Sequence, residues 1–311
     1  MRRQKITLLV LILLGVAGAA ILLPRAHFST ALTAVAAVPR PFVVFDATLY
    51  KNKPSLAAYR VRPLTILYES RLFVANQLPA SMPSEVIVRS LAYELRASPD
   101  PVVVDIERWP LTGDGLAVPS TVAKYLSVLS WVKGEAPDVL FGLYGTVPIP
   151  DYFRAASDPM SPQFLAWRTD NDRLAQIVDH VDALYPSIYT FYPDRQAWVA
   201  HAKAQIAEAR RLAKGKPVYG FLWPLYHNQG NESLGSRPIE PDYWDLQLAT
   251  MAQHADGVVI WGGWGDHGPE PWNEEAPWWQ VTKRFMQRLG PLLLGLLQTS
   301  GPNSGVKLFF L

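Results

Sequence analysis

The sequence contains no cysteine, so disulfide bonds are excluded and the fold must be stabilised by its packed core. It also carries little net charge, because 29 Lys and Arg residues nearly balance 27 Asp and Glu residues. A formal charge of +2 on 311 residues does not create the strong basic field typical of nucleic-acid-binding proteins. We therefore expect no nucleic-acid partner.

Several motifs of cofactor and nucleophile chemistry are also missing. The six histidines show no HExxH or other ligand spacing, so no metal site is expected, and His227 and His267 are expected in solvated loops. No G-x-S-x-G motif occurs, which argues against a serine hydrolase. Residues 263–268, GWGDHG, formally match the dinucleotide motif G-x-G-x-x-G, but Pro269 and Pro271 follow where a phosphate-binding helix should begin. This stretch predicts a loop, and no cofactor is predicted.

One long apolar run is present, at the N-terminus. Residues 6–23 follow the basic sequence MRRQK, and their length lies between that of a signal peptide and that of a membrane anchor. Residues 34–36, AVA, offer a small-residue cleavage pattern. We expect residues 1–40 to be a signal or anchor segment and linker, with the rest of the chain outside the cytoplasm. The protein would be membrane-anchored if the run is retained, and secreted or periplasmic if it is cleaved.

Strand-like and helix-like segments alternate over residues 41–298, ahead of a tail at 299–311. The predicted strands cover 41–47, 64–68, 101–107, 138–145, 181–189, 216–223 and 256–264. The predicted helices cover 84–96, 119–133, 171–180, 194–214, 243–254 and 278–297, with Ser120 and Asp194 as N-caps of the second and fourth. About seven parallel strands joined through helices indicate an α/β fold that closes into a single-domain (β/α) TIM-type barrel.

The third of these strands carries a pair of carboxylates. Val102, Val103 and Val104 lead into Asp105, and Glu107 follows two positions later. Side chains alternate along a strand, so Asp105 and Glu107 are expected on the same side with Cα atoms about 6.5 Å apart. Two such neighbours do not ionise freely, and the retained proton makes a general acid. The alternative interpretation is a structural pair satisfied by a nearby arginine.

The other strand ends bring aromatic residues to the same mouth, since the active site of such barrels lies at the C-terminal ends of the strands. These ends carry Tyr68, Tyr144, Tyr189, Trp223 and Trp261. Hydroxyl groups, carboxylates and indoles are therefore predicted to converge, although barrel cores also use aromatic residues for packing alone.

Five segments resemble, in the same order, sequences of the animal- and venom-type hyaluronidase family of glycoside hydrolases. They are TILYES (65–70), VVDIERW (103–109), FGLYG (141–145), LYPSIY (184–189) and ADGVVIWGGW (255–264). Asn171-Asp172 and residues 289–291, LGP, add support, so the resemblance covers residues 42–291. It implies a distorted barrel that hydrolyses β-1,4 bonds following N-acetylhexosamine in hyaluronan.

The resemblance also implies roles for individual residues. Glu107 matches the general acid of the family, and Asp105 matches the carboxylate beside it. Tyr144 and Tyr189 match the tyrosines that hold the substrate acetamido group, with Tyr189 assigned to the catalytic set. Trp261 matches the indole of that pocket. Tyr68 and Trp264 match further groove positions.

No second strand end offers an equally clear carboxylate nucleophile. That absence favours a retaining mechanism in which the acetamido oxygen of the substrate attacks its own anomeric carbon. The family's disulfides are missing, and Ile106 stands where an aromatic residue is common. We therefore expect a divergent, bacterial-style member acting on an amino-sugar polysaccharide. A non-catalytic polysaccharide-binding barrel, or a glycosidase with Asp46 or Asp266 as its nucleophile, remain the alternatives.

Overall fold

The computed structural model describes residues 41–228 and 233–299. The predictions for residues 1–40, and for the tail beyond Thr299, lie outside the described residues. Within the described ranges, no helix has both the length and the apolar character needed to cross a bilayer.

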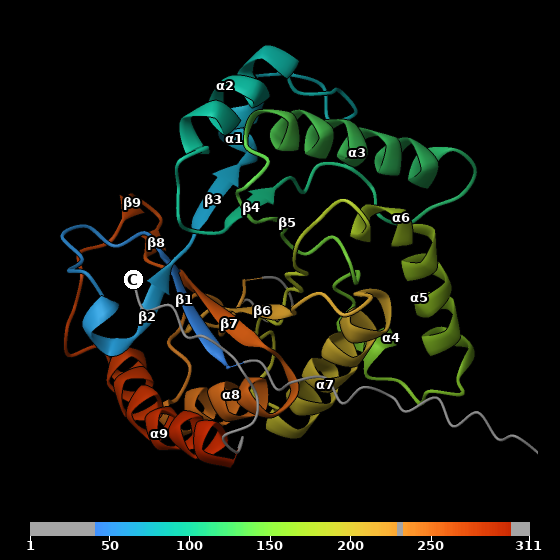
Figure 1. The fold of residues 1–311 in the computed structure, drawn as a ribbon. Helices are drawn as coiled ribbons and strands as arrows, with labels where there is room; N and C mark the ends of the chain where they lie inside the picture. The colour runs from blue at the N-terminus through green and yellow to red at the C-terminus, as the bar shows by residue number, and fades with distance from the viewer. Residues whose placement is uncertain (1–40, 229–232, 300–311) are drawn as a thin grey trace, which may run out of the picture. The chain divides into compact units, whose positions relative to one another are not determined.

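Seven strands pair in parallel as two sheets (Figure 1). The first sheet has the order β2-β1-β7-β6 and the second has the order β3-β4-β5. Their bounds are β1 Val43–Thr48, β2 Val61–Pro63, β3 Thr65–Tyr68, β4 Val102–Asp105, β5 Phe141–Leu143, β6 Tyr219–Leu222 and β7 Gly257–Gly262. A short antiparallel hairpin of β8 (Trp264–Gly265) and β9 (Gly268–Pro269) follows β7. Residues 263–268, expected as a loop, thus include this hairpin.

The segment 184–190 connects the two sheets between β5 and β6. Tyr185 forms an isolated parallel bridge with Tyr144, while Leu184 and Ser187 form bridges with Val218 and Phe221. Near β2 and β3, the Leu64 backbone N–H donates a hydrogen bond to the Asp46 backbone carbonyl oxygen, 3.1 Å. The chain is therefore a distorted (β/α) barrel, as predicted, but the strand predicted at 181–189 is wrong, because this segment makes only isolated bridges, and β2 is a short strand that was not predicted.

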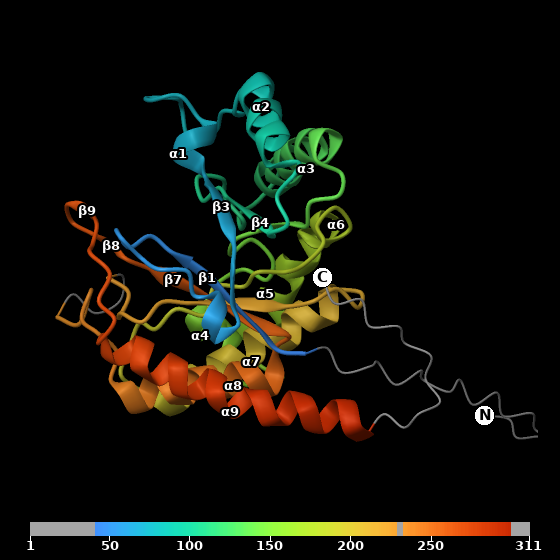
Figure 2. The same ribbon diagram turned by 60° about the vertical axis from the view of Figure 1, so that its left-hand side comes forward.

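Helices surround these strands (Figures 1 and 2). Their bounds are α1 Glu69–Leu72, α2 Glu85–Leu95, α3 Ala117–Glu135, α4 Tyr152–Ala155, α5 Pro162–Arg173, α6 Ala175–Val178, α7 Arg195–Leu212, α8 Pro241–His254 and α9 Pro277–Thr299, with one 3-10 turn at Ala57–Tyr59. α2 packs on α3, and α7, α8 and α9 pack in succession.

Capping side chains explain several of the helix starts. Asp194, predicted as a cap, accepts a hydrogen bond from the Ala197 backbone N–H at 3.0 Å. The helix predicted at 171–180 is wrong in its bounds, because α5 starts at Pro162 and ends at Arg173, before the short α6. The Ser161 hydroxyl accepts a hydrogen bond from the Phe164 N–H at 3.2 Å. Ser161 is therefore the N-cap of α5, which the sequence analysis did not identify. Ser120, predicted as a cap, lies inside α3.

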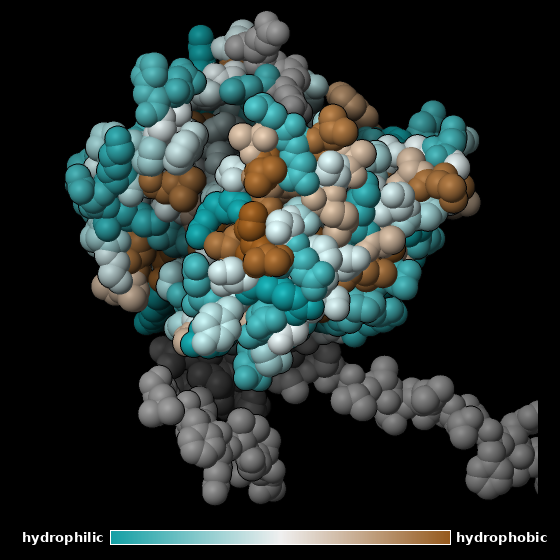
Figure 3. Space-filling model, turned by 90° about the horizontal axis from the view of Figure 1, so that it is seen from above, coloured by the Kyte–Doolittle hydropathy of each residue, from teal (hydrophilic) through white to brown (hydrophobic). Residues whose placement is uncertain are grey.

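Alternate residues of the strands divide the core into an outer and an inner layer. Val102 and Val104 belong to the cluster that packs against the helices, whereas Val103 belongs to a second cluster drawn from the other strands. Gly142 leaves space for the Tyr185 ring in the inner layer, since a Cβ atom there would lie 2.3 Å from a ring carbon. On the face drawn in Figure 3, hydrophobic residues lie in small separate groups among polar ones. The apolar surface is therefore mostly enclosed in the two layers.

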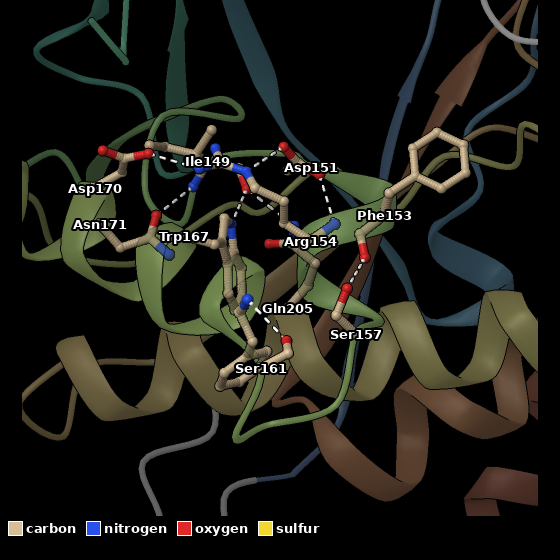
Figure 4. Close-up of polar contacts among 11 residues, drawn as sticks. Ile149, Asp151, Phe153, Arg154, Ser157, Ser161, Trp167, Asp170, Asn171 and Gln205 are labelled. Carbon is tan, nitrogen blue, oxygen red and sulfur yellow. Dashed lines mark hydrogen bonds and ion pairs between the residues drawn. The ribbon is translucent and has the colours of Figure 1, made fainter. Parts of the chain in front are cut away.

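A buried hydrogen-bond network fixes the loop that follows β5 (Figure 4). The Ile149 N–H donates to Asn171 Oδ1 at 2.8 Å, and the Ile149 carbonyl accepts from Trp167 Nε1 and Gln205 Nε2, both at 3.0 Å. Asn171 also donates from Nδ2 to Glu208 Oε1 at 3.3 Å. Helices α5 and α7 therefore hold the backbone of one loop residue from both sides.

We predict that Asn171→Leu lowers the free energy of unfolding by about 1–3 kcal/mol, because it leaves the buried Ile149 N–H without its acceptor. Denaturant unfolding measures this change. Gln163→Leu, at an exposed position of the same helix, is the matched control. Equal stability of the two variants would contradict a structural role for this network.

Candidate active site

Asp105 is the last residue of β4, and the alternation of this strand determines where it lies. Val103 belongs to the inner core layer, so Asp105, two residues later, lies on the same side. Its Oδ1 atom is buried and has no hydrogen-bond partner in the described part of the chain. A buried, unpaired carboxylate oxygen favours the protonated form of the acid.

Ile106 separates the two carboxylates and lies on the opposite side. Its side chain belongs to the outer core layer, and its carbonyl oxygen accepts a 2.6 Å hydrogen bond from the Tyr125 hydroxyl of α3. Glu107 is thereby held on the inner side with Asp105. The prediction from strand periodicity, that both carboxylates face the same way, agrees with this arrangement.

Asp105 and Glu107 line one central pocket of about 230 Å³. The pocket is lined by Ile66, Asp105, Glu107, Tyr144, Tyr189, Phe221, Trp223, His227, Asn228 and Trp261. A second pocket of about 360 Å³ shares Glu107, Tyr144, Tyr189 and His227 with it. Glu107 therefore lies at the boundary between two neighbouring pockets.

Aromatic side chains form the wall of the central pocket. Tyr144 donates from its hydroxyl to Ser187 Oγ at 3.0 Å, and its ring lies 5.9 Å from that of Tyr189. The rings of Trp223 and Trp261 lie 5.1 Å apart, and each lies about 6 Å from the Tyr189 ring. The structure thus brings together Tyr144, Tyr189 and Trp261, which the sequence placed on three different strand ends.

Tyr68 and Trp264 occupy different positions from these three. Tyr68 accepts a 2.9 Å hydrogen bond from Trp261 Nε1 and lines a third cavity, of about 490 Å³, next to the central pocket. Trp264 lies in β8, 53% of it is exposed, and it does not line the central pocket. Tyr68 is thus connected to the central pocket through Trp261, and Trp264 is separate from it.

Burial and neighbouring negative charge raise the pKa of both carboxyl groups. Desolvation, followed by the charges of Glu107 and Glu69, raises the pKa of Asp105 to about 7. Desolvation and then Glu69 also raise the pKa of Glu107. The charge of Glu107 thus contributes to the raised pKa of Asp105, whereas the pKa of Glu107 is raised by burial and by Glu69 rather than by Asp105.

Burial also raises the pKa of the tyrosine hydroxyls. Desolvation raises the pKa of Tyr144 and of Tyr189 well above the usual value, and it raises that of Tyr68 to about 12. These hydroxyls therefore remain neutral and can donate hydrogen bonds to a bound molecule.

Glu69 and His227 are site residues that the sequence did not single out. Glu69, directly after β3, accepts a 3.1 Å hydrogen bond from the Glu107 backbone N–H and forms an ion pair with Arg108 at 3.4 Å. Only its place at a strand end could have indicated it. His227 was expected in solvent but lines both pockets, and its ring stacks on Tyr189 at 5.8 Å. Burial lowers its pKa.

The two alternative nucleophiles lie elsewhere. Asp46 forms a 2.6 Å ion pair with Lys53 and lines the cavity beside Tyr68. Asp266 lies in the turn between β8 and β9 and lines none of these three cavities. Within residues 41–228 and 233–299, no three His, Cys, Asp or Glu residues are grouped so that they could hold a metal ion.

The fold is similar to that of known hyaluronidase structures. The crystal structure of bee venom hyaluronidase matches 82% of this chain and 99% of its own, with a TM-score of 0.55 and 15% sequence identity. Its complex with a hyaluronic acid tetramer matches 83% of this chain and 98% of its own, with a TM-score of 0.50 and 16% identity. No family model matches the sequence, and a search of curated proteins finds no match. At this identity the likeness establishes the barrel fold.

We predict that Asp105→Asn increases stability at pH 8 by about 4 kcal/mol, and has little effect at pH 4. The pKa of Asp105 is raised from 3.8 to about 7 on folding, so the folded state binds the proton more tightly than the unfolded state. The resulting stability is present below about pH 4 and is lost as the pH rises through 7.

Denaturant unfolding at a series of pH values measures this difference. Asp138→Asn, at an exposed position outside the pocket, serves as the control and should show no such dependence. A pH-independent effect of Asp105→Asn would mean that this carboxyl does not have a raised pKa.

Proposed function

We propose that this protein is an endo-acting glycoside hydrolase that cleaves β-linked N-acetylhexosamine polysaccharide with retention of configuration. One observation carries the proposal: Asp105 and Glu107 face the same pocket as Tyr144, Tyr189 and Trp261. A binding protein has no need for two carboxyl groups of raised pKa in the floor of its pocket.

Glu107 is the general acid in this proposal. It lies where two pockets meet, so one sugar on each side of it would place the bridging oxygen beside its carboxyl group. Its pKa is raised by burial and by Glu69, which favours the protonated form that a general acid needs. Asp105 shares the proton of the pair before the reaction, and the water of the second step returns Glu107 to its protonated form.

The substrate supplies the nucleophile. Among the described residues that line the central pocket, Asp105 and Glu107 are the only carboxylates, and Glu107 lies two positions after Asp105, the last residue of β4. A separate enzyme nucleophile would have to lie about 5–5.5 Å from the acid across the scissile bond. The acetamido carbonyl oxygen instead attacks the anomeric carbon, and the bond to the leaving sugar breaks as its oxygen takes the proton of Glu107.

The aromatic wall orients this internal nucleophile. The neutral hydroxyls of Tyr144 and Tyr189 orient the acetamido group, and Trp261 packs against the sugar and excludes water. Water then attacks the cyclic oxazolinium intermediate and gives a proton to Glu107, now acting as base. The anomeric carbon is inverted twice, so its configuration is retained.

The proposed enzyme is hyaluronidase-like. Its support is the ordered set of sequence resemblances together with the barrel shared with bee venom hyaluronidase. In the second of these structures that protein is bound to a hyaluronic acid tetramer, an amino-sugar polymer. The proposed substrate class for this chain is accordingly an amino-sugar polysaccharide.

We expect Glu107→Gln to lower turnover of an N-acetylhexosamine polymer by about 10²–10⁴-fold, because the acid and base are both lost. Release of reducing ends measures the rate. Asp266→Asn, outside the three cavities, should retain activity and serves as the matched control. Full activity of Glu107→Gln would refute the assignment, and loss of activity in Asp266→Asn alone would favour the alternative nucleophile.

We expect the newly formed reducing end to keep the β-configuration when it first appears. Proton NMR of the product during the first minutes of the reaction shows the anomer before mutarotation. A polymer whose amino groups carry no acetyl group should not be cut, since it lacks the attacking oxygen. An initial α-anomer, or cleavage of the deacetylated polymer at the same rate, is incompatible with substrate assistance.

A further inference from the structure

Three cavities lie next to one another at the C-terminal ends of the strands. The central pocket shares Ile66 with the cavity beside Tyr68, and it shares Glu107 and Tyr144 with the pocket on its other side. Ile149 and Pro150 belong to the wall of that last pocket, and the network around Ile149 holds them in place (Figure 4). A polymer crossing the site therefore meets preformed walls on both sides of Glu107.

The charged side chains that line these cavities are either acidic or already part of an ion pair. Within the described chain, no Lys or Arg lines the central pocket, which carries Asp105 and Glu107. The pocket beyond Glu107 likewise has no lysine or arginine among its described lining residues. The sequence of residues 229–232, QGNE, adds no cation either.

Lys53 is the cation of the remaining cavity, and its ammonium group is engaged by neighbouring residues. It contacts Asp46 Oδ2 at 2.6 Å, the Thr48 carbonyl oxygen at 2.5 Å and Thr48 Oγ1 at 2.9 Å. Three contacts use the three protons of the ammonium group, and the Asp46 charge balances its own. This cavity offers no free positive charge to an anionic sugar.

The arginine nearest to the acid pair in the sequence lies outside the cavities, with its Nε and Nη1 atoms buried and without a hydrogen-bond partner in the described chain. Arg108 forms an ion pair with Glu69 and lies over the Phe73 ring, 3.7 Å from its centroid. It lines none of the three cavities. A uronate bound near Glu107 would therefore face carboxyl groups without a compensating cation.

From this charge distribution we infer that the substrate is an uncharged N-acetylhexosamine polymer rather than a polymer containing uronate, such as hyaluronan. The inference rests on the proposed function and narrows its substrate class. Neutral sugars satisfy the tyrosine hydroxyls and indoles of the pocket without bringing a second negative charge to the acid pair.

The test compares hyaluronan with hyaluronan whose uronate carboxylates have been chemically reduced to hydroxymethyl groups. The two polymers have the same linkages and acetamido groups and differ only in charge. We expect kcat/KM to be at least about tenfold higher for the reduced polymer, with a preference that decreases as salt is added. Soluble chitin oligosaccharides provide a naturally uncharged comparison.

A charge introduced into the lining should change this preference. Thr112 is an exposed residue of the pocket beyond Glu107, and Thr112→Lys would supply the missing cation. We expect this variant to improve hyaluronan cleavage relative to the reduced polymer by several fold. Thr169→Lys, on the exposed surface of α5, adds the same charge outside the cavities and should leave the ratio unchanged.

The outcomes separate the inference from the proposed function. Equal or faster cleavage of unmodified hyaluronan would overturn the inference and leave the glycosidase intact. If neither polymer nor the chitin oligosaccharides are cut, calorimetric binding to the Glu107→Gln variant decides the point. Tighter binding of the uncharged polymers would support the inference even without turnover. Binding of none of the polymers would contradict both the inference and the proposed function.

Discussion

The alternation of side chains along β4 is the constraint on which the rest of the site depends. Val103 and Asp105 lie on the inner side, while Val102, Val104 and Ile106 pack outward against the helices. The apolar residues fix the register, because a shift by one position would turn three of them into the barrel and both acids into the outer core. Packing of ordinary hydrophobic residues thus determines where the reactive groups face.

Burying two acids beside each other is unfavourable, and the surrounding contacts hold them in place. Tyr125 binds the carbonyl of the residue between them, and Glu69 binds the N–H of Glu107. The same Glu69 contact adds a negative charge that raises both pKa values. One side chain therefore both positions the backbone and increases the proton affinity of the pair. Because the chain has no cysteine, these polar contacts and the two core layers hold the site in place without disulfide bonds.

Local sequence predicted most of the framework but only part of the site. The β-branched run before Asp105 and the Asp194 cap are signals contained within a few residues, and they gave the third strand and the start of α7. The segment 184–190 pairs only through isolated bridges, since Pro186 has no N–H to donate to a continuous ladder. Glu69 and His227 could not be ranked from the sequence, because their importance arises from residues that are distant along the chain. Trp264 matched a family position, yet the β8–β9 hairpin places it in a largely exposed position.

The charge of the cavities and the chemistry of the acid pair are linked. In the proposed mechanism the same carboxyl must release a proton in the first step and recover it in the second, which requires a pKa close to the working pH. Desolvation and Glu69 already raise this pKa, and a uronate bound nearby would raise it further. The acid would then be harder to ionise, so its action as a base in the second step would be slowed. An uncharged substrate leaves the pKa values of the two carboxyl groups unchanged. A groove without free cations favours such a substrate over an anionic one.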